Sequence, residues 1–272
     1  MDARDFYDEI ADDYRLVYPD WAASVRRQAG ALDGVIQAEL GAGRQRILDC
    51  TCGIGTQALG LAALGHEVVG RDVSARAIGR AREEAERLGV DIRLEVADIR
   101  SPPEVDRGAF DVVLSADNSL PHLLSDVDLR AGIRGMLSAL RRGGLLLASI
   151  RDYDGLLGQR PGSTPPMAAG PPGERRIVFQ LWEWSDDGRT YELELFVLKE
   201  RGGDWSVRSA KTRYRPVTRR ELTGILDDEG CPGARWIMPE ESGFFQPVLM
   251  ARPGEKPGPK VVAELDLGPD GP

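Results

Sequence analysis

The chain of 272 residues is long enough to bury a sizeable core and suits one large domain, or a core with an elaborated appendage. Its 35 Lys and Arg against 44 Asp and Glu give a net charge of −9, which argues against polyanions and anionic membrane surfaces as main partners. Charge alone does not exclude tRNA or DNA, but no basic run supports them, and no apolar run approaches the about 20 residues of a membrane span. We therefore predict no nucleic-acid partner and no membrane association.

The small number of cysteines and histidines limits which cellular compartment and which metal sites the sequence can indicate. Cys50 and Cys52 lie one residue apart in a tight segment, which suits reduced thiols and indicates a cytoplasmic protein. With only His66 and His122 and no Cys-x-x-Cys, a zinc site lacks ligands at usable spacing, so we predict no metal. The acidic start MDARDFYDEIADDY does not resemble a secretion signal.

Residues from about 4 to 40 are predicted to be helical. Phe6, Tyr7, Ile10 and Tyr14 repeat at helical spacing, and Asp20 is placed as the N-cap of a second helix. The aromatic side chains fit either a packed core or a lid that closes over a ligand.

The stretch 47–57, ILDCTCGIGTQ, joins a buried strand, an acidic turn and a glycine loop. Gly53 and Gly55 let the backbone adopt turn conformations and let a ligand approach the main chain. A helix over about 56–64 follows, with its free N–H groups facing the loop. The pattern predicts a nucleotide cradle, and Gly53-x-Gly55-x-x-Ala58 also satisfies the loose dinucleotide fingerprint, so an NAD-dependent oxidoreductase stays open.

Strands and helices then alternate. We expect further strands at 66–70, 91–96, 110–115 and 145–150, and helices at about 74–88 and 127–140. Gly143-Gly144 is predicted to end the second helix, with Arg141 and Arg142 at the negative end of its dipole. The fold class is therefore α/β, a Rossmann-like doubly wound sheet.

The chain changes character after residue 150. RPGSTPPMAAGPPG, within 155–173, predicts a flexible surface loop without regular structure. Beta-prone runs at 177–184, 190–199 and 205–217 predict an antiparallel meander, followed by a helix over 218–230 with a Thr218–Glu221 capping box. Strands at 235–238 and 245–251 close the fold, and the tail after residue 252 is predicted to be disordered.

Acidic or polar side chains follow the successive strands, at the edge where open α/β sheets bind ligands. Asp49 precedes the glycines, and Asp72 ends the second strand, where a carboxylate can accept both hydroxyls of a ribose. Asp98 is placed to accept the amino group of an adenine while Ile99 packs on the ring. Asp117-Asn118 follow the fourth strand, over the centre of the site.

Motifs spread over about residues 5–252 resemble those of a known family. They read FYDEIADDY, DCTCGIGTQALGLA, GRDVS, ADIR, ADNSLPHLL, SIRDYD, QLWEW and ESGFFQP. With them the chain resembles class I S-adenosylmethionine-dependent methyltransferases, and within these the glycine/sarcosine N-methyltransferase group. Thr51 departs from the family pattern, which usually has its first glycine there, but Gly53 and Gly55 remain.

The resemblance implies S-adenosylmethionine as cofactor and S-adenosylhomocysteine as product. The residues expected at the cofactor are Tyr14, Trp21, Asp49, Gly53, Gly55, Asp72, Val73, Asp98, Ile99 and Asp117. It also implies a helical lid (1–40), a cofactor-binding core (41–155), a loop and β insertion (156–217), a helix and strands completing the core (218–252) and a flexible tail (253–272).

In glycine-type relatives, the asparagine of the fourth-strand motif and the arginine after the fifth strand hold the substrate carboxylate. Those positions are Asn118 and Arg151 here, although Arg151 also fits a surface ion pair. His122, with a reference pKa near 6.5, is a candidate to assist deprotonation of an amine. Other side chains expected to line the acceptor pocket are Tyr7, Tyr153, Trp182 and Phe244.

The leading interpretation is an enzyme that methylates a small-molecule acceptor, as a monomer or homo-oligomer. The leading candidate for the methyl acceptor is the amino nitrogen of a small amino acid, as in glycine or sarcosine. N-, C- or O-methylation of a specialised metabolite such as an indole is the alternative, because an aromatic pocket favours a bulky or cationic acceptor. A nicotinamide oxidoreductase explains Asp49 and Asp98 less well, and a non-catalytic binding scaffold also stays open.

Overall fold

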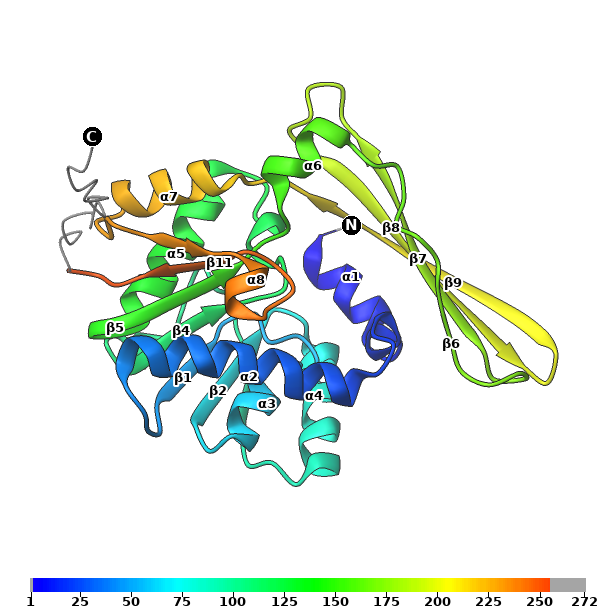
Figure 1. The fold of residues 1–272 in the computed structure, drawn as a ribbon, viewed down its shortest axis with the longest axis horizontal. Helices are drawn as coiled ribbons and strands as arrows, with labels where there is room; N and C mark the ends of the chain where they lie inside the picture. Colours follow the sequence, from blue (N-terminus) through cyan, green and yellow to red (C-terminus); the bar gives the residue numbers. More distant parts are fainter. Residues whose placement is uncertain (1, 255–272) are drawn as a thin grey trace, which may run out of the picture.

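The computed structural model describes residues 2–254, so the predicted disordered tail lies, from residue 255 onward, outside the described residues. Figure 1 shows a central sheet with helices on both faces and a second, antiparallel sheet that leans away from it. The N-terminal helix α1 (Ala3–Ile10) lies between these two parts and contacts strand β9 of the second sheet and helix α4 of the core.

The central sheet has seven strands in the order β10-β11-β5-β4-β1-β2-β3. Its first five strands along the chain are parallel, and β11 runs antiparallel to β5. The bounds are β1 (Arg46–Asp49), β2 (Glu67–Asp72), β3 (Arg93–Val96), β4 (Phe110–Ser115), β5 (Leu140–Ser149), β10 (Arg235–Ile237) and β11 (Val248–Ala251). The strand order reverses between β1 and β4, which is where doubly wound sheets bind ligands, and the predicted fold class is confirmed.

Two apolar layers cover the sheet. On one face, α2 (Trp21–Leu40), α3 (Ala58–Ala63) and α4 (Ala75–Leu88) share a core cluster with β1, β4 and β5. On the other face, α5 (Asp126–Ala139) and α7 (Arg219–Asp228) pack with the second sheet. The predicted N-caps Asp20 and Thr218, and Ser74 before α4, each accept a hydrogen bond from the first turn of their helix. The Glu221 half of the capping box pairs with Arg215 instead.

The junction between α5 and β5 differs from the prediction. The helix ends at Ala139 and the strand starts at Leu140, so Arg141 and Arg142 lie in β5 and not at the end of a helix dipole. In the pairing of β4 with β5, Phe110 lies opposite Leu140 and Val112 lies opposite Leu145. The four residues between Leu140 and Leu145 therefore form an irregularity in β5. Gly143, with φ 73°, adopts the left-handed backbone conformation that this bend requires. The Gly143-Gly144 pair therefore marks a bend in the strand, whereas the sequence predicts the end of the helix there.

The second sheet contains β6 (Met167–Ala169), β7 (Arg176–Trp184), β8 (Tyr191–Arg201) and β9 (Asp204–Tyr214) in that order. The three long strands confirm the predicted meander. The prediction that 155–173 lacks regular structure is wrong, because α6 (Tyr153–Gln159) enters it and β6 pairs with β7. Prolines are tolerated there because they lie before and after β6, a short edge strand, and not within it.

Short elements complete the chain. They are the 3₁₀ helices η1 (Tyr14–Val17), η2 (Glu104–Asp106) and η3 (Leu120–His122), and the helix α8 (Pro239–Ser242). The last strand starts at Val248, three residues later than predicted, because 245–247 lie outside β11. No helix of the described residues combines the length and the apolar character that crossing a membrane requires.

Candidate functional site

A cavity of about 250 Å³ opens at the carboxyl ends of β1 to β4. Its floor comes from the glycine loop and from the residues that follow β2, β3 and β4. The opposite wall comes from α1 and η1, through Tyr7, Tyr14 and Tyr18. Of the predicted site residues, the cavity brings together Tyr7, Tyr14, Asp72, Val73, Asp98, Ile99, Asp117 and His122.

The glycine loop lies at the floor of the cavity. Gly53 and Gly55 have φ values of 53° and 90°, and a Cβ at position 55 would lie 2.8 Å from the Leu59 side chain. Neither glycine is itself a cavity wall, but their neighbours Cys52 and Ile54 are. The loop is therefore fixed in shape by residues that lack a side chain.

Asp72 is held at both carboxylate oxygens. Oδ2 accepts from the Gly53 N–H at 2.8 Å, and Oδ1 accepts from the Ser74 N–H at 2.9 Å. Burial raises the pKa of this carboxyl to about 6, although the two amides act in the opposite direction. Each oxygen keeps a lone pair, so the group can accept two ligand hydroxyls in a fixed orientation.

Asp49 lies outside the cavity lining, at the end of β1, and is 1% exposed. Its Oδ1 accepts a long bond of 3.3 Å from the Thr51 N–H, and its Oδ2 has no partner among the described residues. Burial raises the pKa of Asp49 to about 7, with nearby Asp72 adding to the rise. A buried carboxylate with so little compensation is poised for a cationic partner.

Asp98 and Ile99 line the cavity after β3. Arg100 binds the Asp98 carboxylate through Nε at 3.0 Å and Nη2 at 2.6 Å, and these bonds lower its pKa. Arg100 also reaches Asp128 at the start of α5. The carboxylate is thereby kept ionised, with its orientation set by an arginine that the sequence analysis does not select.

The Asp117-Asn118 turn after β4 has two consecutive left-handed residues, with φ values of 56° and 65°. Such strain persists only where the surroundings enforce it, and the Ser149 hydroxyl and carbonyl accept the two backbone N–H groups. Asp117 accepts the Tyr18 hydroxyl at 2.9 Å, and burial raises its pKa to about 6. Asn118 is buried, with Oδ1 bound to the Arg151 N–H and Nδ2 without a partner among the described residues.

Arg151 lies behind this turn, against the second sheet, and is not part of the cavity lining. Its guanidinium donates to the Tyr191 hydroxyl at 2.7 Å and stands 4.7 Å and 5.2 Å from the ring centroids of Trp182 and Tyr214. It forms no ion pair with any described residue. The carboxylates of Asp152 and Asp154, which the sequence offers as surface partners, pair with Arg219 instead.

His122 connects Tyr7 of α1 to the second sheet. Its Nε2 and the Tyr7 hydroxyl lie 3.1 Å apart, and its Nδ1 and the Thr212 hydroxyl lie 3.4 Å apart. Burial, aided by the positive charge of Arg151, lowers the pKa of His122 to about 3. The imidazole is therefore neutral near pH 7 and is a weak base.

Four other predicted residues lie outside the cavity lining. Tyr153 is fully buried and bonds the Tyr191 hydroxyl at 2.9 Å, and Trp182 belongs to the same core cluster. Phe244 packs in the cluster on the α2 face of the sheet. Trp21 donates to the hydroxyl of Thr56, a cavity residue, at 3.1 Å, and so supports the loop from behind.

Several cavity or supporting residues are not found by the sequence reasoning. Tyr18 directly follows η1 in extended backbone, and its only local signal is its closeness to Tyr14 along the chain. Tyr191 and Tyr214 pair across β8 and β9 and stack with centroids 5.4 Å apart, which no local pattern reveals. Register between distant strands decides this part of the site.

Comparison with known proteins agrees with this geometry. Residues 47–144 match the family model described as methyltransferase domain. The glycine/sarcosine N-methyltransferase of Halorhodospira halochloris is 31% identical over 138 residues, which cover 51% of this chain and 50% of the relative. The structure of SAM-bound CalS10, an amino pentose methyltransferase from Micromonospora echinaspora, aligns with a TM-score of 0.67 at 19% identity, covering 84% of this chain and 91% of that one.

Residues 47–144 therefore carry a methyltransferase domain, and the resemblance to S-adenosylmethionine-dependent methyltransferases that the motifs indicate is confirmed. Its relatives include glycine/sarcosine N-methyltransferases at about 30% identity, and it spans about half the length of the curated relatives that it matches. The tRNA 5-carboxymethoxyuridine methyltransferase of Escherichia coli (strain K12) is 32% identical over 161 residues, 56% of this chain and 58% of that protein. This relative acts on nucleic acid, so the comparisons leave that acceptor class open.

The residues present fit the cofactor. Asp72 offers two oriented acceptors for ribose hydroxyls, and Ile99 offers an apolar surface for the adenine. Asp49 does not line the cavity, but its Oδ2, which has no partner among the described residues, lies beside the glycine loop and favours the positive amino group of an amino-acid end through its charge. When bound, S-adenosylmethionine supplies an activated methyl group on its sulfonium. The protein then has to hold an acceptor lone pair in line with that group and exclude water.

Proposed function

We propose that the protein methylates the amino nitrogen of a small carboxylate-bearing acceptor, of the glycine or sarcosine type. The observation that supports this is the pairing of two groups: the partly buried Arg151 guanidinium, which has no ion pair among the described residues, and the buried Asn118 Nδ2, which has no hydrogen-bond partner among them. They are linked directly, since Asn118 Oδ1 accepts the Arg151 backbone N–H at 3.0 Å.

A carboxylate satisfies both donors at once. Its two oxygens can accept from the arginine fork and from the amide, and the guanidinium charge offsets the cost of burying the anion. The aromatic faces of Trp182 and Tyr214 and the Tyr191 hydroxyl limit how far the guanidinium can move. Arg151 is thus held ready before the acceptor arrives, which reduces the entropy lost on binding.

The acceptor amine has to lose its proton before attack. His122 holds a proton weakly because its pKa is lowered to about 3, so we infer that water, and not His122, takes the proton. The Tyr7 hydroxyl, bonded to the same ring, fixes the orientation of the imidazole. The carboxyl groups of Asp72 and Asp117 face the same cavity and favour binding of a cation there.

The experiment is an acceptor screen with purified protein, following release of S-adenosylhomocysteine and then product mass. The panel contains glycine, sarcosine, dimethylglycine, indolic amines, amino sugars and bulk tRNA. We expect turnover of the carboxylate-bearing amines. Turnover of tRNA alone would contradict both the small-molecule acceptor and the absence of a nucleic-acid partner.

Arg151→Met then tests the residue. Loss of a partly buried charged donor should lower kcat/KM for a carboxylate acceptor by about 100-fold, with cofactor affinity unchanged. Arg213→Met is the matched control, because Arg213 is exposed and precedes Tyr214 on the same strand, with its side chain on the opposite face. Equal kcat/KM values for Arg151→Met and the wild type would refute the amino-acid acceptor.

A second candidate is N-, C- or O-methylation of a specialised metabolite such as an indole. The specific observation in its favour is the tyrosine-lined wall of the cavity, with Tyr7, Tyr14 and Tyr18 available to contact a ring. This candidate predicts that indolic amines are turned over and that Arg151→Met is active on them.

A cytoplasmic location is also inferred. Cys50, Cys52 and Cys231 are all free and buried, as is usual for proteins of a reducing compartment. Fractionation of cells that express the tagged protein tests this inference.

A further inference from the structure

The segment of residues 3–18, here called the N-terminal strap, contains α1 and η1 and forms one wall of the cofactor cavity. Its Tyr7, Tyr14 and Tyr18 face the glycine loop and Asp72 across that cavity. A ligand held between the two walls cannot leave on this side unless the strap moves. What attaches the strap to the rest of the molecule is therefore relevant to cofactor binding.

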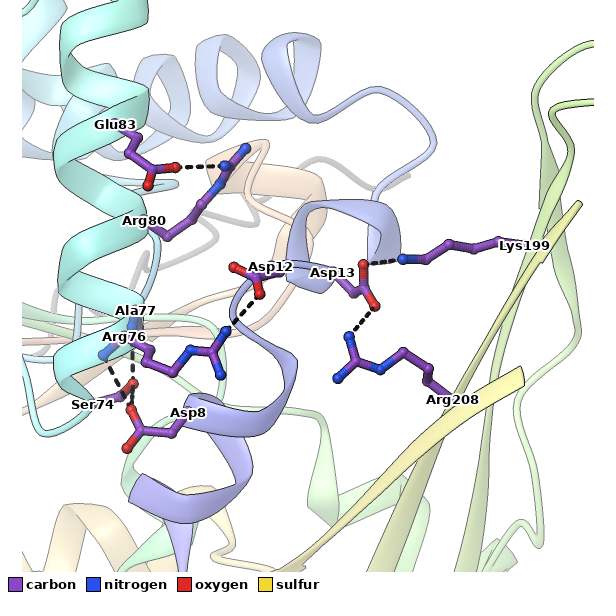
Figure 2. Close-up of polar contacts among 10 residues, drawn as sticks. All are labelled: Asp8, Asp12, Asp13, Ser74, Arg76, Ala77, Arg80, Glu83, Lys199 and Arg208. Atoms are coloured by element: carbon purple, nitrogen blue, oxygen red, sulfur yellow. Dashed lines mark hydrogen bonds and ion pairs between the residues drawn. The ribbon is translucent and has the colours of Figure 1, made fainter. Parts of the chain in front are cut away.

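The first attachment joins the strap to the cofactor-binding loop after β2. Asp8 Oδ1 accepts from the Ser74 hydroxyl at 2.5 Å and from the Arg76 N–H at 3.2 Å, as Figure 2 shows. Ser74 in turn donates its backbone N–H to Asp72 at 2.9 Å. A chain of two hydrogen bonds thus runs from the strap to the carboxylate that faces the ligand hydroxyls.

The position of the Asp8 carboxylate at the start of a helix also stabilises this attachment. The Ser74 and Arg76 groups that it binds are at the N-terminus of α4, a helix of 14 residues, where a negative charge is stabilised by the exposed N–H groups. The hydroxyl of Ser74 serves two roles, because it also caps the helix by accepting from the Ala77 N–H at 3.0 Å. Loss of the Asp8 carboxylate therefore leaves the Ser74 cap of the helix in place, and removes the link to the strap together with a favourable charge at the helix N-terminus.

The second attachment joins the strap to the second sheet. Asp13 lies between α1 and η1, is 6% exposed, and pairs with Lys199 of β8 and with Arg208 of β9, the latter at 3.3 Å (Figure 2). A carboxylate this buried relies on both cations to offset its desolvation. Removing a partner is costly in that setting, unlike in an exposed ion pair.

An exposed ion pair lies beside these attachments and provides a control. Asp12 binds Arg76 at 2.6 Å, with side chains that are 59% and 58% exposed. Exposed pairs of this kind contribute little because water and salt screen them. Asp12 is on the same strap, one residue from Asp13, and has the same charge.

We propose that Asp8 and Asp13 are positioning residues that fasten the strap over the cofactor and set the rate at which it leaves. Asp8 fastens the strap to the β2–α4 loop, and Asp13 fastens it to the sheet that carries Tyr214. Because Tyr7 also bonds His122, a closed strap orders the cofactor wall and the acceptor side together. Release of the bound product requires the strap to open, as lid opening limits turnover in many enzymes.

The test uses S-adenosylhomocysteine binding alone, so it does not depend on the acceptor and stays informative if the proposed function fails. Dissociation is followed by stopped-flow displacement, and Kd by calorimetry, for the wild type, Asp8→Ala, which removes the accepting oxygen, Asp13→Asn and Asp12→Asn. We expect dissociation to be about tenfold faster, and Kd to rise by a similar factor, in the first two variants. Asp12→Asn should stay close to the wild type.

A charge series at Lys199 separates fastening from general stability. Lys199→Met should release the ligand faster, and Lys199→Arg, which keeps the charge, should restore slow release. Hydrogen exchange of residues 3–18 in the complex should rise in Asp13→Asn and in Lys199→Met. If Asp13→Asn does not fold, Lys199→Met carries the test. Wild-type dissociation and exchange in Lys199→Met, or equal effects of Asp12→Asn and Asp13→Asn, would overturn the proposal.

Discussion

Asp49→Asn should make the unliganded protein less sensitive to pH. The Asp49 carboxyl is 1% exposed, its Oδ2 has no partner among the described residues, and burial raises its pKa from 3.8 to about 7. Because the folded-state pKa lies above the unfolded value, the folded state binds the proton more tightly. This contribution to stability is fully present below pH 3.8 and is lost as the pH rises through about 7.

The magnitude follows from linkage. Each pH unit between the two pKa values costs about 1.4 kcal/mol of the free energy of unfolding, so the step from pH 5 to pH 8 costs about 3 kcal/mol at this group. Asparagine cannot ionise, so the variant lacks this loss. The buried amide carries its own desolvation cost, but that cost does not change with pH.

Urea unfolding at several pH values between 5 and 8 measures the effect on both proteins. The wild type should lose about 3 kcal/mol more than Asp49→Asn over this range, while Asp186→Asn, an exposed control, should follow the wild type. Equal pH slopes for the wild type and Asp49→Asn would refute the assignment of a protonated, buried carboxyl. In a second arm, Asp49→Asn should bind S-adenosylhomocysteine more weakly, as expected if the residue is retained for the cofactor and not for stability.

Three further predictions follow from single contacts. Asp72→Asn replaces a double acceptor by a group with one acceptor oxygen, so calorimetry should show S-adenosylhomocysteine bound about 2 kcal/mol more weakly. Gly60→Ala puts a Cβ 2.5 Å from that of Ala29 and 2.8 Å from the Val25 carbonyl oxygen. It should separate α3 from α2 and lower the free energy of unfolding by about 1–3 kcal/mol, which an unchanged urea midpoint would contradict. The pH–rate profile of kcat should show no inflection from His122 near pH 6.5, because the pKa of His122 is lowered to about 3. An inflection near pH 6.5 in the wild type that is absent in His122→Gln would contradict this.

The proposed strap and the acceptor site meet at one ring. His122 lies between Tyr7 of the strap and Tyr214 of the second sheet, whose ring centroid is 4.1 Å away. A substitution that loosens the strap therefore also disturbs the acceptor side. For this reason the variants of Asp8 and Asp13 are best judged on binding of S-adenosylhomocysteine, where no acceptor takes part.

Errors in the element prediction arise where local chemistry admits two outcomes. Gly143-Gly144 carries the signal of a helix end, but pairing of Leu140 with Phe110 draws the chain into β5 earlier. Met167–Ala169 stands between prolines and glycines, yet the free edge of β7 supplies partners for its backbone. In both cases hydrogen bonds to a distant strand outweigh the local preference.

The sequence by itself determined the alternation of strands and helices, the helix caps and the cofactor edge of the sheet. Those features depend on periodicity, on glycine conformation and on residues that directly follow strands, all of which are local. Only the tertiary structure decided that Asp98 is held by Arg100, that Arg151 lies among stacked rings with no ion pair to a described residue, and that Asp13 meets Lys199. These contacts join residues through strand register and layer packing, which a local pattern does not encode. Burial, and with it the pKa values of Asp49 and His122, is set by the same packing.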